Sequence, residues 1–264
     1  MRHPLVDDVC DAYLALADAR LPGLVTGMYL YGSVALGDFR PAHSDVDAVF
    51  VTARPLDAGD RGGLREVHAE LAERLPRPHL DGVYITADAL ASDPTGTTGP
   101  HSSDGRFGDD GTFERLLVTW HTLADTGVTV RGPAVESLRI HTDRAALNAW
   151  LRDNLRGYWR HLWRTLSAGT EAARREGRHD FTPPWCVLGV TRLHYTLATG
   201  AITSKSGAGE YGMRVFDDRW APIITESLRL RRGEDTAPGY PDLDVRHADV
   251  VAYMDMVITD ADRP

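Results

Sequence analysis

The spacing of apolar residues divides the chain into a first half in which strand and helix patterns alternate and a second half in which only helix patterns recur. In the first half, apolar runs with period-two alternation predict strands, and apolar residues three and four apart predict helices. We expect helices over 4–19, 63–75 and 113–124, and strands that end at Tyr31, begin at Asp45, and span 80–86 and 127–133. These elements predict an α/β domain with a mixed sheet.

From residue 143 onward the strand patterns disappear. The predicted helices span 143–168, 184–199, 217–231 and 244–259, and glycine- and proline-containing breaks separate them. We therefore predict an α/β domain over 1–140 followed by an all-helical bundle over 141–264. Residues 91–111 are rich in Ser, Thr, Gly, Asp and Pro, which predicts a long loop, and whether it acts as a lid stays open.

Polar residues of a distinctive kind interrupt the first strands. Gly32-Ser33 follows one apolar run, and Asp45-Val46-Asp47, with Ser44 directly before it, begins the next. Glycine lets the backbone approach a phosphate, and serine adds a hydroxyl donor. Side chains two apart in a strand share a face, so Asp45 and Asp47 are placed to bind one hard cation such as Mg²⁺. The segment predicts a site for phosphates and metal, although each half alone is also typical of an ordinary turn or a solvated strand edge.

Composition excludes several classes of function. The chain has 264 residues, 42% hydrophobic and 25% charged, and a net charge of −9, which argues against broad binding to nucleic acid and favours a cationic partner. No apolar run is long enough to cross a bilayer and the N-terminus has no secretory pattern, so we expect a cytoplasmic protein. Cys10 and Cys186 are expected to be small buried hydrophobes.

One basic residue differs from all the others. Of the 29 lysines and arginines, only Lys205 is a lysine. A compact ammonium at this position indicates a site that a planar guanidinium does not fit. The alternative is chance, because a composition biased towards arginine can leave a single lysine. The segment is not a Walker A loop, because Ser204 stands where that motif has glycine before its lysine.

The Gly-Ser turn followed by Ser-Asp-Val-Asp resembles the signature of the polymerase-β-like nucleotidyltransferases. The resemblance implies two Mg²⁺ ions, held by Asp45 and Asp47, and a third carboxylate on a nearby strand. Asp81 is the candidate, since it alternates with Val83 and Ile85 as in a half-buried strand. It is expected to act as a metal ligand and general base; the alternative is an aspartate that only begins a strand.

Residues 185–206 extend the resemblance to the aminoglycoside nucleotidyltransferases of the streptomycin and spectinomycin type. Arg192, Tyr195, Thr199-Gly200 and Lys205 match a helix that ends in a Thr-Gly turn and is followed by a lysine. The resemblance implies transfer of AMP from ATP to a hydroxyl of an aminoglycoside or aminocyclitol, with release of pyrophosphate. Gly32, Ser33, Ser44, Arg192 and Lys205 are then expected to bind the nucleotide.

The acceptor side departs from the family pattern. The family has an acidic residue and a tryptophan ahead of this helix; here two prolines, at 183 and 184, displace the correspondence. Asp180 and Trp185 are candidates from shifted positions, or they belong to a helix-entry loop with a core tryptophan. The acidic residues of the 91–111 region and Glu114 could attract ammonium groups or lie in solvent. Adenylylation of a different small-molecule or protein hydroxyl, and a non-catalytic nucleotide-binding module, stay open as alternatives.

Overall fold

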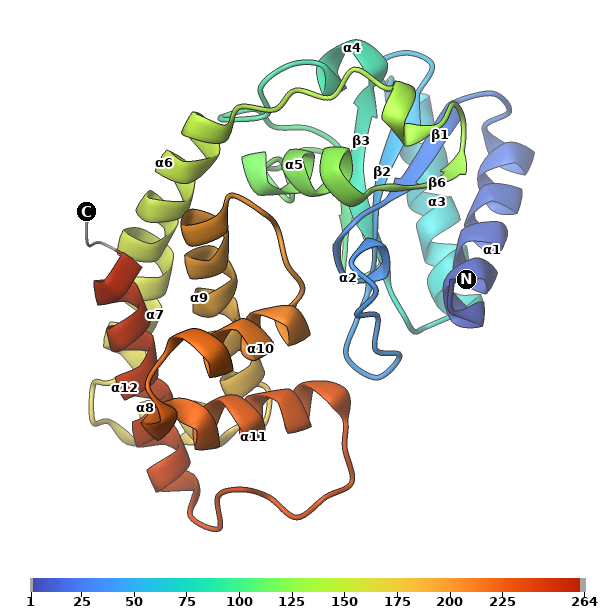
Figure 1. Cartoon of the computed structure of the whole chain (residues 1–264). Helices are drawn as coiled ribbons and strands as arrows, with labels where there is room; N and C mark the ends of the chain where they lie inside the picture. The colour runs from blue at the N-terminus through green and yellow to red at the C-terminus, as the bar shows by residue number, and fades with distance from the viewer. Residues whose placement is uncertain (1, 262–264) are drawn as a thin grey trace. The chain divides into compact units, whose positions relative to one another are not determined.

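The computed structural model describes residues 2–261. Contacts divide the chain into two compact units, Met1–Asp143 and Arg144–Pro264. The first contains a mixed sheet flanked by helices, and the second is built from helices, as Figure 1 shows. Both parts of the predicted fold class are thereby confirmed.

A six-stranded sheet organises the first unit, with the strand order β5-β4-β3-β2-β1-β6. The strands are β1 (Val25–Leu30), β2 (Val46–Thr52), β3 (Leu80–Thr86), β4 (His101–Ser103), β5 (Arg106–Gly108) and β6 (Val128–Arg131). Only the central pair, β2 and β3, is parallel, and the other neighbours are antiparallel. Because a parallel pair needs a crossover connection, the long helix between β2 and β3 follows from the topology.

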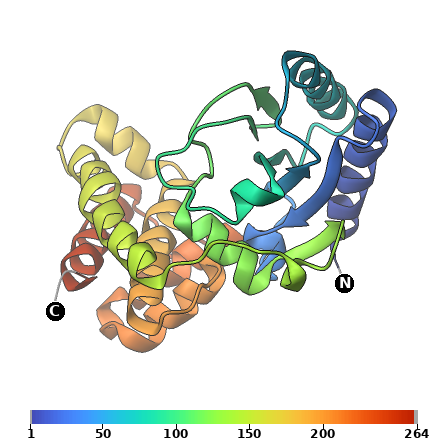
Figure 2. The same ribbon diagram turned by 90° about the horizontal axis from the view of Figure 1, so that it is seen from above.

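The two faces of the sheet are covered by different helices. On one face α1 (Pro4–Arg20) and α3 (Ala58–Arg74) lie side by side and pack on Val46, Ala48 and Phe50 of β2 (Figures 1 and 2). On the other face α5 (Leu117–Thr126) packs on the alternate residues of the same strand, Val49 and Val51. Burial on both faces explains why the sequence shows continuous apolar runs here.

Helix α3 begins earlier than the apolar pattern predicts. Asp57 caps it by accepting a hydrogen bond from the backbone N–H of Asp60, and the Asp60 side chain accepts one in return from the N–H of Asp57. This reciprocal capping box starts the helix at Ala58 although its first turn carries almost no apolar residues. The prediction of a helix start at residue 63 was therefore wrong by about one turn, because capping rather than periodicity sets the boundary.

The predicted loop over 91–111 contains an unpredicted hairpin. Strands β4 and β5 pair with each other, and β4 adds to β3 through Gly82 and Val83. The turn between them has left-handed backbone at Asp104 (φ 51°) and Gly105 (φ 70°). Strands of three residues, without apolar alternation, give no periodic signal. Two four-residue helices, α2 (Gly32–Ala35), which begins with the Gly-Ser pair, and α4 (Ala87–Leu90), and a 3₁₀ turn, Val135–Ser137, complete the unit.

The second unit packs around α9. Its helices are α6 (Arg144–Asn154), a π-helical turn (Leu155–Trp159), α7 (Arg160–Leu166), α8 (Glu171–Arg178), α9 (Thr182–Thr199), α10 (Lys205–Val215), a 3₁₀ turn (Asp218–Trp220), α11 (Ala221–Arg232) and α12 (Leu243–Ala261). Gly200 caps the C-terminal end of helix α9. Its φ of 72° is left-handed, a conformation that glycine adopts readily. The core includes Val187 and Val190 of α9 with Tyr253 and Val257 of α12.

Two helices of this unit escape the sequence pattern. Helix α8 is almost entirely polar, and α10 contains Gly207, Gly209 and Gly212, residues that lower helix propensity. A Cβ on Gly209 would lie 2.6 Å from the side chain of Leu228 in α11, so the glycine permits close packing of the two helices. Tertiary contact, rather than propensity, therefore stabilises α10.

Two further expectations concern membrane crossing and the cysteines. Within residues 2–261 no helix combines the length and the apolar character that crossing a membrane requires. Cys10 and Cys186 are both buried and reduced, as predicted, and burial raises the pKa of each thiol to about 12. Neither thiol is therefore a nucleophile near neutral pH.

Candidate active site

Polar side chains gather on the α5 face of the three central strands. Tyr31 follows β1 directly, and its backbone N–H donates to the carbonyl of Asp47 in β2 at 3.0 Å. Asp47 is in turn the register partner of Asp81 in the parallel strand β3. Partners in register share a face, and Val49 and Val83 mark it as the face that α5 covers. The fold thus brings Asp47 and Asp81 together from 34 positions apart in the sequence.

The Gly32-Ser33 turn lies against Asp47. Gly32 has φ 61°, and a Cβ at this position would overlap Oδ2 of Asp47, so any other residue would displace the carboxylate. The Oγ atom of Ser33 is buried and has no hydrogen-bond partner within the described part of the chain. A buried hydroxyl without a partner is costly unless a ligand supplies one. The turn and Asp47 are therefore one structural unit, as the motif predicted.

Asp45, His79 and Asp81 form the group whose ligand atoms could hold a metal ion. One atom from each of the three side chains lies within 4.8 Å of the others. Two carboxylates suit a hard divalent cation, and the half-exposed position of Asp45 leaves room for water or phosphate oxygens. The residues present therefore fit a divalent metal. Asp45 and Asp81 were predicted from the sequence, whereas His79 was missed because a single histidine before a strand carries no signal.

Asp81 is buried, and backbone N–H groups hold its carboxylate. Its Oδ1 accepts from the N–H of Gly105 at 2.9 Å, and its Oδ2 from the N–H of Asp104 at 3.1 Å, both in the β4–β5 turn. Burial raises the pKa of Asp81, these two hydrogen bonds lower it in part, and the charge of Asp45 raises it further. A carboxylate that is oriented by backbone donors and has a raised pKa suits the role of proton acceptor. The hairpin that the sequence did not predict thus orients the predicted base.

Two of the predicted residues have local partners. Arg77 donates to Oδ1 of Asp45 at 3.0 Å, and the arginine side chain is 67% exposed, so solvent weakens this pair. The hydroxyl of Ser44 accepts from the backbone N–H of Arg40 at 3.0 Å and closes the loop that leads to Asp45. This bond gives Ser44 a role in shaping the loop, and its predicted contact with nucleotide stays a prediction.

A further carboxylate that lies near the site comes from the segment before α5. Glu114 has left-handed backbone, with φ 53°, and its carboxylate accepts from the hydroxyl of Thr119 at 2.6 Å. Burial raises the pKa of Tyr31 well above its usual range, and the negative charges of Glu114 and Asp47 add to the rise. Glu114 and Asp47 therefore both lie close enough to the Tyr31 hydroxyl to affect its pKa. In contrast, Asp109 of the same acidic region pairs with Arg65 in an exposed ion pair.

In the helical unit the predicted nucleotide-binding residues lie close together at one end of α10. Lys205 is the first residue of this helix, after the N-cap Ser204. Arg192 of α9 donates to the carbonyl of Thr203 at 3.2 Å, two residues before Lys205. The Nζ atom of Lys205 lies 4.8 Å from the ring centroid of Trp185. The structure thus gathers two cations at the positive end of a helix dipole, where anions are stabilised.

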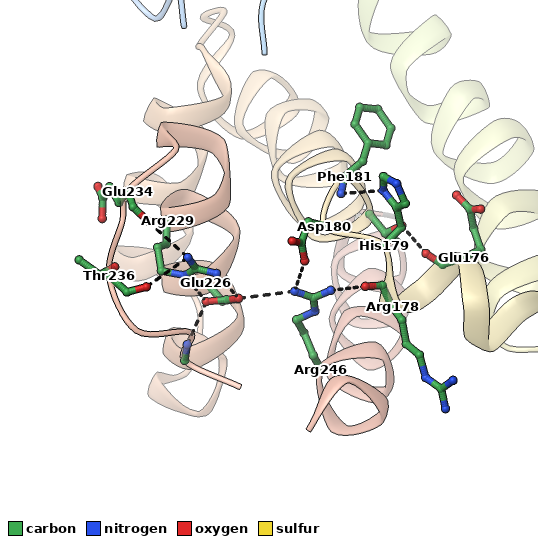
Figure 3. A network of polar contacts seen from close by, with 12 residues as sticks. Glu176, Arg178, His179, Asp180, Phe181, Glu226, Arg229, Glu234, Thr236 and Arg246 are labelled. Carbon is green, nitrogen blue, oxygen red and sulfur yellow. Dashed lines mark hydrogen bonds and ion pairs between the residues drawn. The ribbon is translucent and has the colours of Figure 1, made fainter. Parts of the chain in front are cut away.

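Trp185 and Asp180 lie at the entry to α9. The ring of Trp185 stacks on Phe181 at 5.4 Å, and its indole N–H donates to the hydroxyl of Tyr158 at 3.1 Å. The carboxylate of Asp180 is 72% exposed, and it accepts from Arg246 at 2.8 Å (Figure 3). This pair fixes the direction of an otherwise solvated aspartate.

Arg246, the partner of Asp180, belongs to a buried network of charged side chains. Arg246 is 2% exposed, donates to the carbonyl of Arg178 at 2.6 Å, and lies 3.6 Å from the carboxylate of Glu226. Glu226 also accepts from Arg229 and from the N–H of Gly239 (Figure 3). The pKa of Glu226 is lowered, chiefly by its hydrogen bonds with Arg229. This network could not be predicted from sequence patterns, because its members come from separate segments of the chain.

Comparison with known proteins agrees with this geometry. Residues 15–88, which include the Gly-Ser turn and all three predicted aspartates, match the family model of the nucleotidyltransferase domain. Residues 159–259 match the model described as the C-terminal domain of aminoglycoside adenylyltransferase. The chain belongs to the aminoglycoside adenylyltransferases. The two matches, in the order that the sequence predicted, confirm the predicted enzyme class of nucleotidyltransferase and adenylyltransferase.

A solved structure shares the fold of this adenylyltransferase. It is a spectinomycin adenyltransferase from Enterococcus faecialis, crystallised with ATP and spectinomycin. The likeness has a TM-score of 0.68 and covers 94% of this chain and 99% of the other, at 12% sequence identity. At this identity the likeness shows a common fold, and the substrates of the relative are its own.

Proposed function

We propose that the chain transfers AMP from ATP to a hydroxyl of an aminocyclitol antibiotic of the spectinomycin or streptomycin type, in the presence of Mg²⁺, and releases pyrophosphate. The observation that carries the proposal is that Asp47 and Asp81 are register partners on adjacent strands, with Asp45 close to Asp81, beside a buried Ser33 hydroxyl that has no hydrogen-bond partner within residues 2–261. The family assignment supports the reaction class. The solved relative makes spectinomycin the first acceptor to test.

On the donor side, Gly32 and Ser33 would bind phosphate oxygens of ATP, and Asp45, Asp47 and Asp81 would hold the Mg²⁺ ions. When bound, such ions stabilise negative charge on the attacking and leaving oxygens of an in-line displacement. The buried Ser33 hydroxyl then gains the hydrogen-bond partner that it lacks in the protein alone. Gly32 keeps the Asp47 carboxylate in place, since a side chain there would collide with it.

Asp81 accepts the proton of the acceptor hydroxyl. The hydroxyl oxygen attacks the α-phosphorus of ATP, the bond from this phosphorus to the bridging oxygen breaks, and pyrophosphate leaves. The two backbone N–H groups of the β4–β5 turn orient the Asp81 carboxylate before substrate arrives. A base whose pKa is raised by burial takes up a proton more readily than a solvated aspartate.

Lys205 and Arg192 bind the phosphates of the nucleotide. Contacts within the helical unit support this role. Lys205 begins α10, and Arg192 donates to the carbonyl of Thr203, two residues before Lys205. An ammonium on a triphosphate supplies a point charge where negative charge accumulates. The pairing of Lys205 with the Trp185 ring holds the lysine side chain in one direction before ATP binds.

The acceptor is cationic, and acidic side chains select it. Glu114 lies near Tyr31, and its left-handed backbone is typical of a functional position. Asp180 and Trp185 offer a fixed carboxylate and an aromatic face for an aminocyclitol. The net charge of −9 favours approach of such a substrate.

The proposal is tested by incubating the protein with α-labelled ATP, Mg²⁺ and single acceptors. We expect label to move to spectinomycin or streptomycin with stoichiometric pyrophosphate. Transfer only when a cell extract is added would instead support adenylylation of another small-molecule or protein hydroxyl. Binding of ATP without any pyrophosphate release, with every acceptor, would contradict the proposal.

A further inference from the structure

The metal group contains a nitrogen atom that neither the motif nor the proposed reaction requires. His79 lies two residues before Asp81, and its Nδ1 is 3.8 Å from Oδ1 of Asp45. The same atom is buried and makes no hydrogen bond within residues 2–261. A buried ring nitrogen without a partner is an available metal ligand when the ring is neutral.

The position of the His79 ring is set by the fold. The carbonyl of His79 accepts from the N–H of Val46 at 2.8 Å, which ties the residue to the start of β2. On its other side, a Cβ on Gly105 would lie 3.4 Å from the ring, so the β4–β5 turn packs against it. The turn that orients Asp81 therefore also confines His79 next to Asp81.

We infer that His79 is a third protein ligand, and that the position it shares with Asp45 and Asp81 prefers a divalent transition metal ion of the Mn²⁺ type to Mg²⁺. Imidazole suits transition metals, whereas Mg²⁺ favours oxygen ligands. Two carboxylates and one imidazole are a mixed donor set of borderline hardness. The inference rests on the proposed function, because it concerns one metal position of the same site.

Arg77 is the competitor that a metal must displace from Asp45. Its guanidinium donates to the same Oδ1 atom that faces His79. The arginine side chain is 67% exposed and the pair is solvated, so the cost of exchanging Arg77 for a metal is small. The alternative function of His79 is to pair, when protonated, with Asp45, and that function needs no metal.

The decisive experiment is electron paramagnetic resonance of Mn²⁺ bound to the full-length protein. Tripolyphosphate replaces ATP, so that the protein is the only source of nitrogen. Pulsed measurements should show coupling of Mn²⁺ to a directly bound nitrogen, and ¹⁵N-histidine labelling should change that signal. Absence of nitrogen coupling in the wild-type protein overturns the inference, and this result needs no variant to fold.

Variants then assign the nitrogen. His79→Asn places an amide where Nδ1 was and should abolish the nitrogen coupling and lower Mn²⁺ affinity roughly tenfold or more, while Mg²⁺ affinity changes by less than about threefold. His101→Asn is the matched control, because His101 is a half-buried histidine of the neighbouring strand whose Nδ1 lies 3.2 Å from the carbonyl oxygen of Gly99. Equal loss of Mn²⁺ affinity in both variants, or an unchanged signal in His79→Asn, overturns the inference.

An activity assay separates this inference from the proposed function. If wild-type protein transfers AMP and His79→Asn leaves the Mn²⁺-to-Mg²⁺ preference unchanged, the inference fails and the function stands. If nitrogen coupling is found but no acceptor is adenylylated with either metal, the function fails and the metal ligand stands.

Discussion

The two units place buried carboxylates in opposite environments. In the nucleotidyltransferase unit, Asp81 is held by two backbone N–H groups, and burial raises its pKa. In the helical unit, Glu226 is 1% exposed, it is hydrogen-bonded to Arg229 and lies 3.6 Å from Arg246, and its pKa is lowered. A carboxylate can bind a metal ion or accept a proton only if no cationic side chain already neutralises it. A carboxylate that joins helices is instead neutralised by neighbouring cations. The difference predicts that the same chemical change has unlike consequences in the two units.

Asp81→Asn should have the largest effect, and on activity. We expect kcat to fall by roughly 10²–10⁴-fold, because the amide can neither accept the hydroxyl proton nor bind metal as strongly. The free energy of unfolding should change by no more than about 1–2 kcal/mol, since the amide oxygen keeps one of the two hydrogen bonds from the turn. Steady-state kinetics and denaturant unfolding measure both. Turnover near the wild-type rate would exclude Asp81 as the base.

Glu226→Gln makes the matched change in the helical unit and should act on stability. The amide removes the buried counter-charge that Arg229 and Arg246 share and leaves Arg246 paired with the exposed Asp180, so we expect a loss of about 3 kcal/mol. In the folded fraction kcat should stay within about threefold of the wild-type value. Chemical denaturation followed by tryptophan fluorescence measures the first, and the transfer assay the second. Wild-type stability in this variant would contradict the structural role of the network.

A neutral buried group in the first unit should make stability depend on pH. His68 accepts or donates a hydrogen bond with Tyr84 at 2.7 Å, and burial lowers its pKa to about 4. Because the unfolded histidine titrates near 6.5, this contribution is complete above about pH 6.5 and is lost as pH falls towards 4. We expect a loss of about 3 kcal/mol over this window. Unfolding measured at several pH values should show it, and His68→Gln should flatten the profile there.

Lys205→Ala tests whether the helical unit also carries a functional charge. Loss of one charge-assisted contact with phosphate should cost about 2 kcal/mol, which corresponds to roughly 30-fold in affinity for ATP. The free energy of unfolding should change by no more than about 1 kcal/mol, because Lys205 is half-buried and its contact with the Trp185 ring is a cation–π pair. Equilibrium binding of ATP is the measurement. Unchanged ATP affinity together with unchanged turnover would remove Lys205 from the site.

The smallest effect is expected at an exposed carboxylate. Asp109 pairs with Arg65, and the two side chains are 55% and 52% exposed. Asp109→Asn should change the free energy of unfolding by less than about 1 kcal/mol and leave kcat unchanged. The variant is a baseline for the other carboxylates. A large loss of activity here would show that the acidic segment before α5 contacts the acceptor more widely than at Glu114.

Sequence patterns predicted most of the elements and the donor side of the site. The Gly-Ser turn and Asp47 were found because glycine and paired carboxylates are unusual beside apolar strands, and the structure brings Gly32, Asp47 and Asp81 together. His79 was not singled out, and Glu114 was named only as one member of an acidic region, because their places in the site depend on a hairpin and on a left-handed residue that have no periodic signal. The contacts of Ser44, Asp180 and Trp185 with substrate stay predictions.

The amino-acid sequence alone determined the fold class and the family, and it predicted the carboxylates of the donor site, since these depend on local periodicity and on short motifs. Only the tertiary structure decided which atoms hold Asp81, which histidine joins the metal group and which cations neutralise Glu226. Those partners lie far apart along the chain, and hydrogen bonds and ion pairs act only over a few ångström. The availability of each buried carboxylate is therefore a property of the fold and not of the motif.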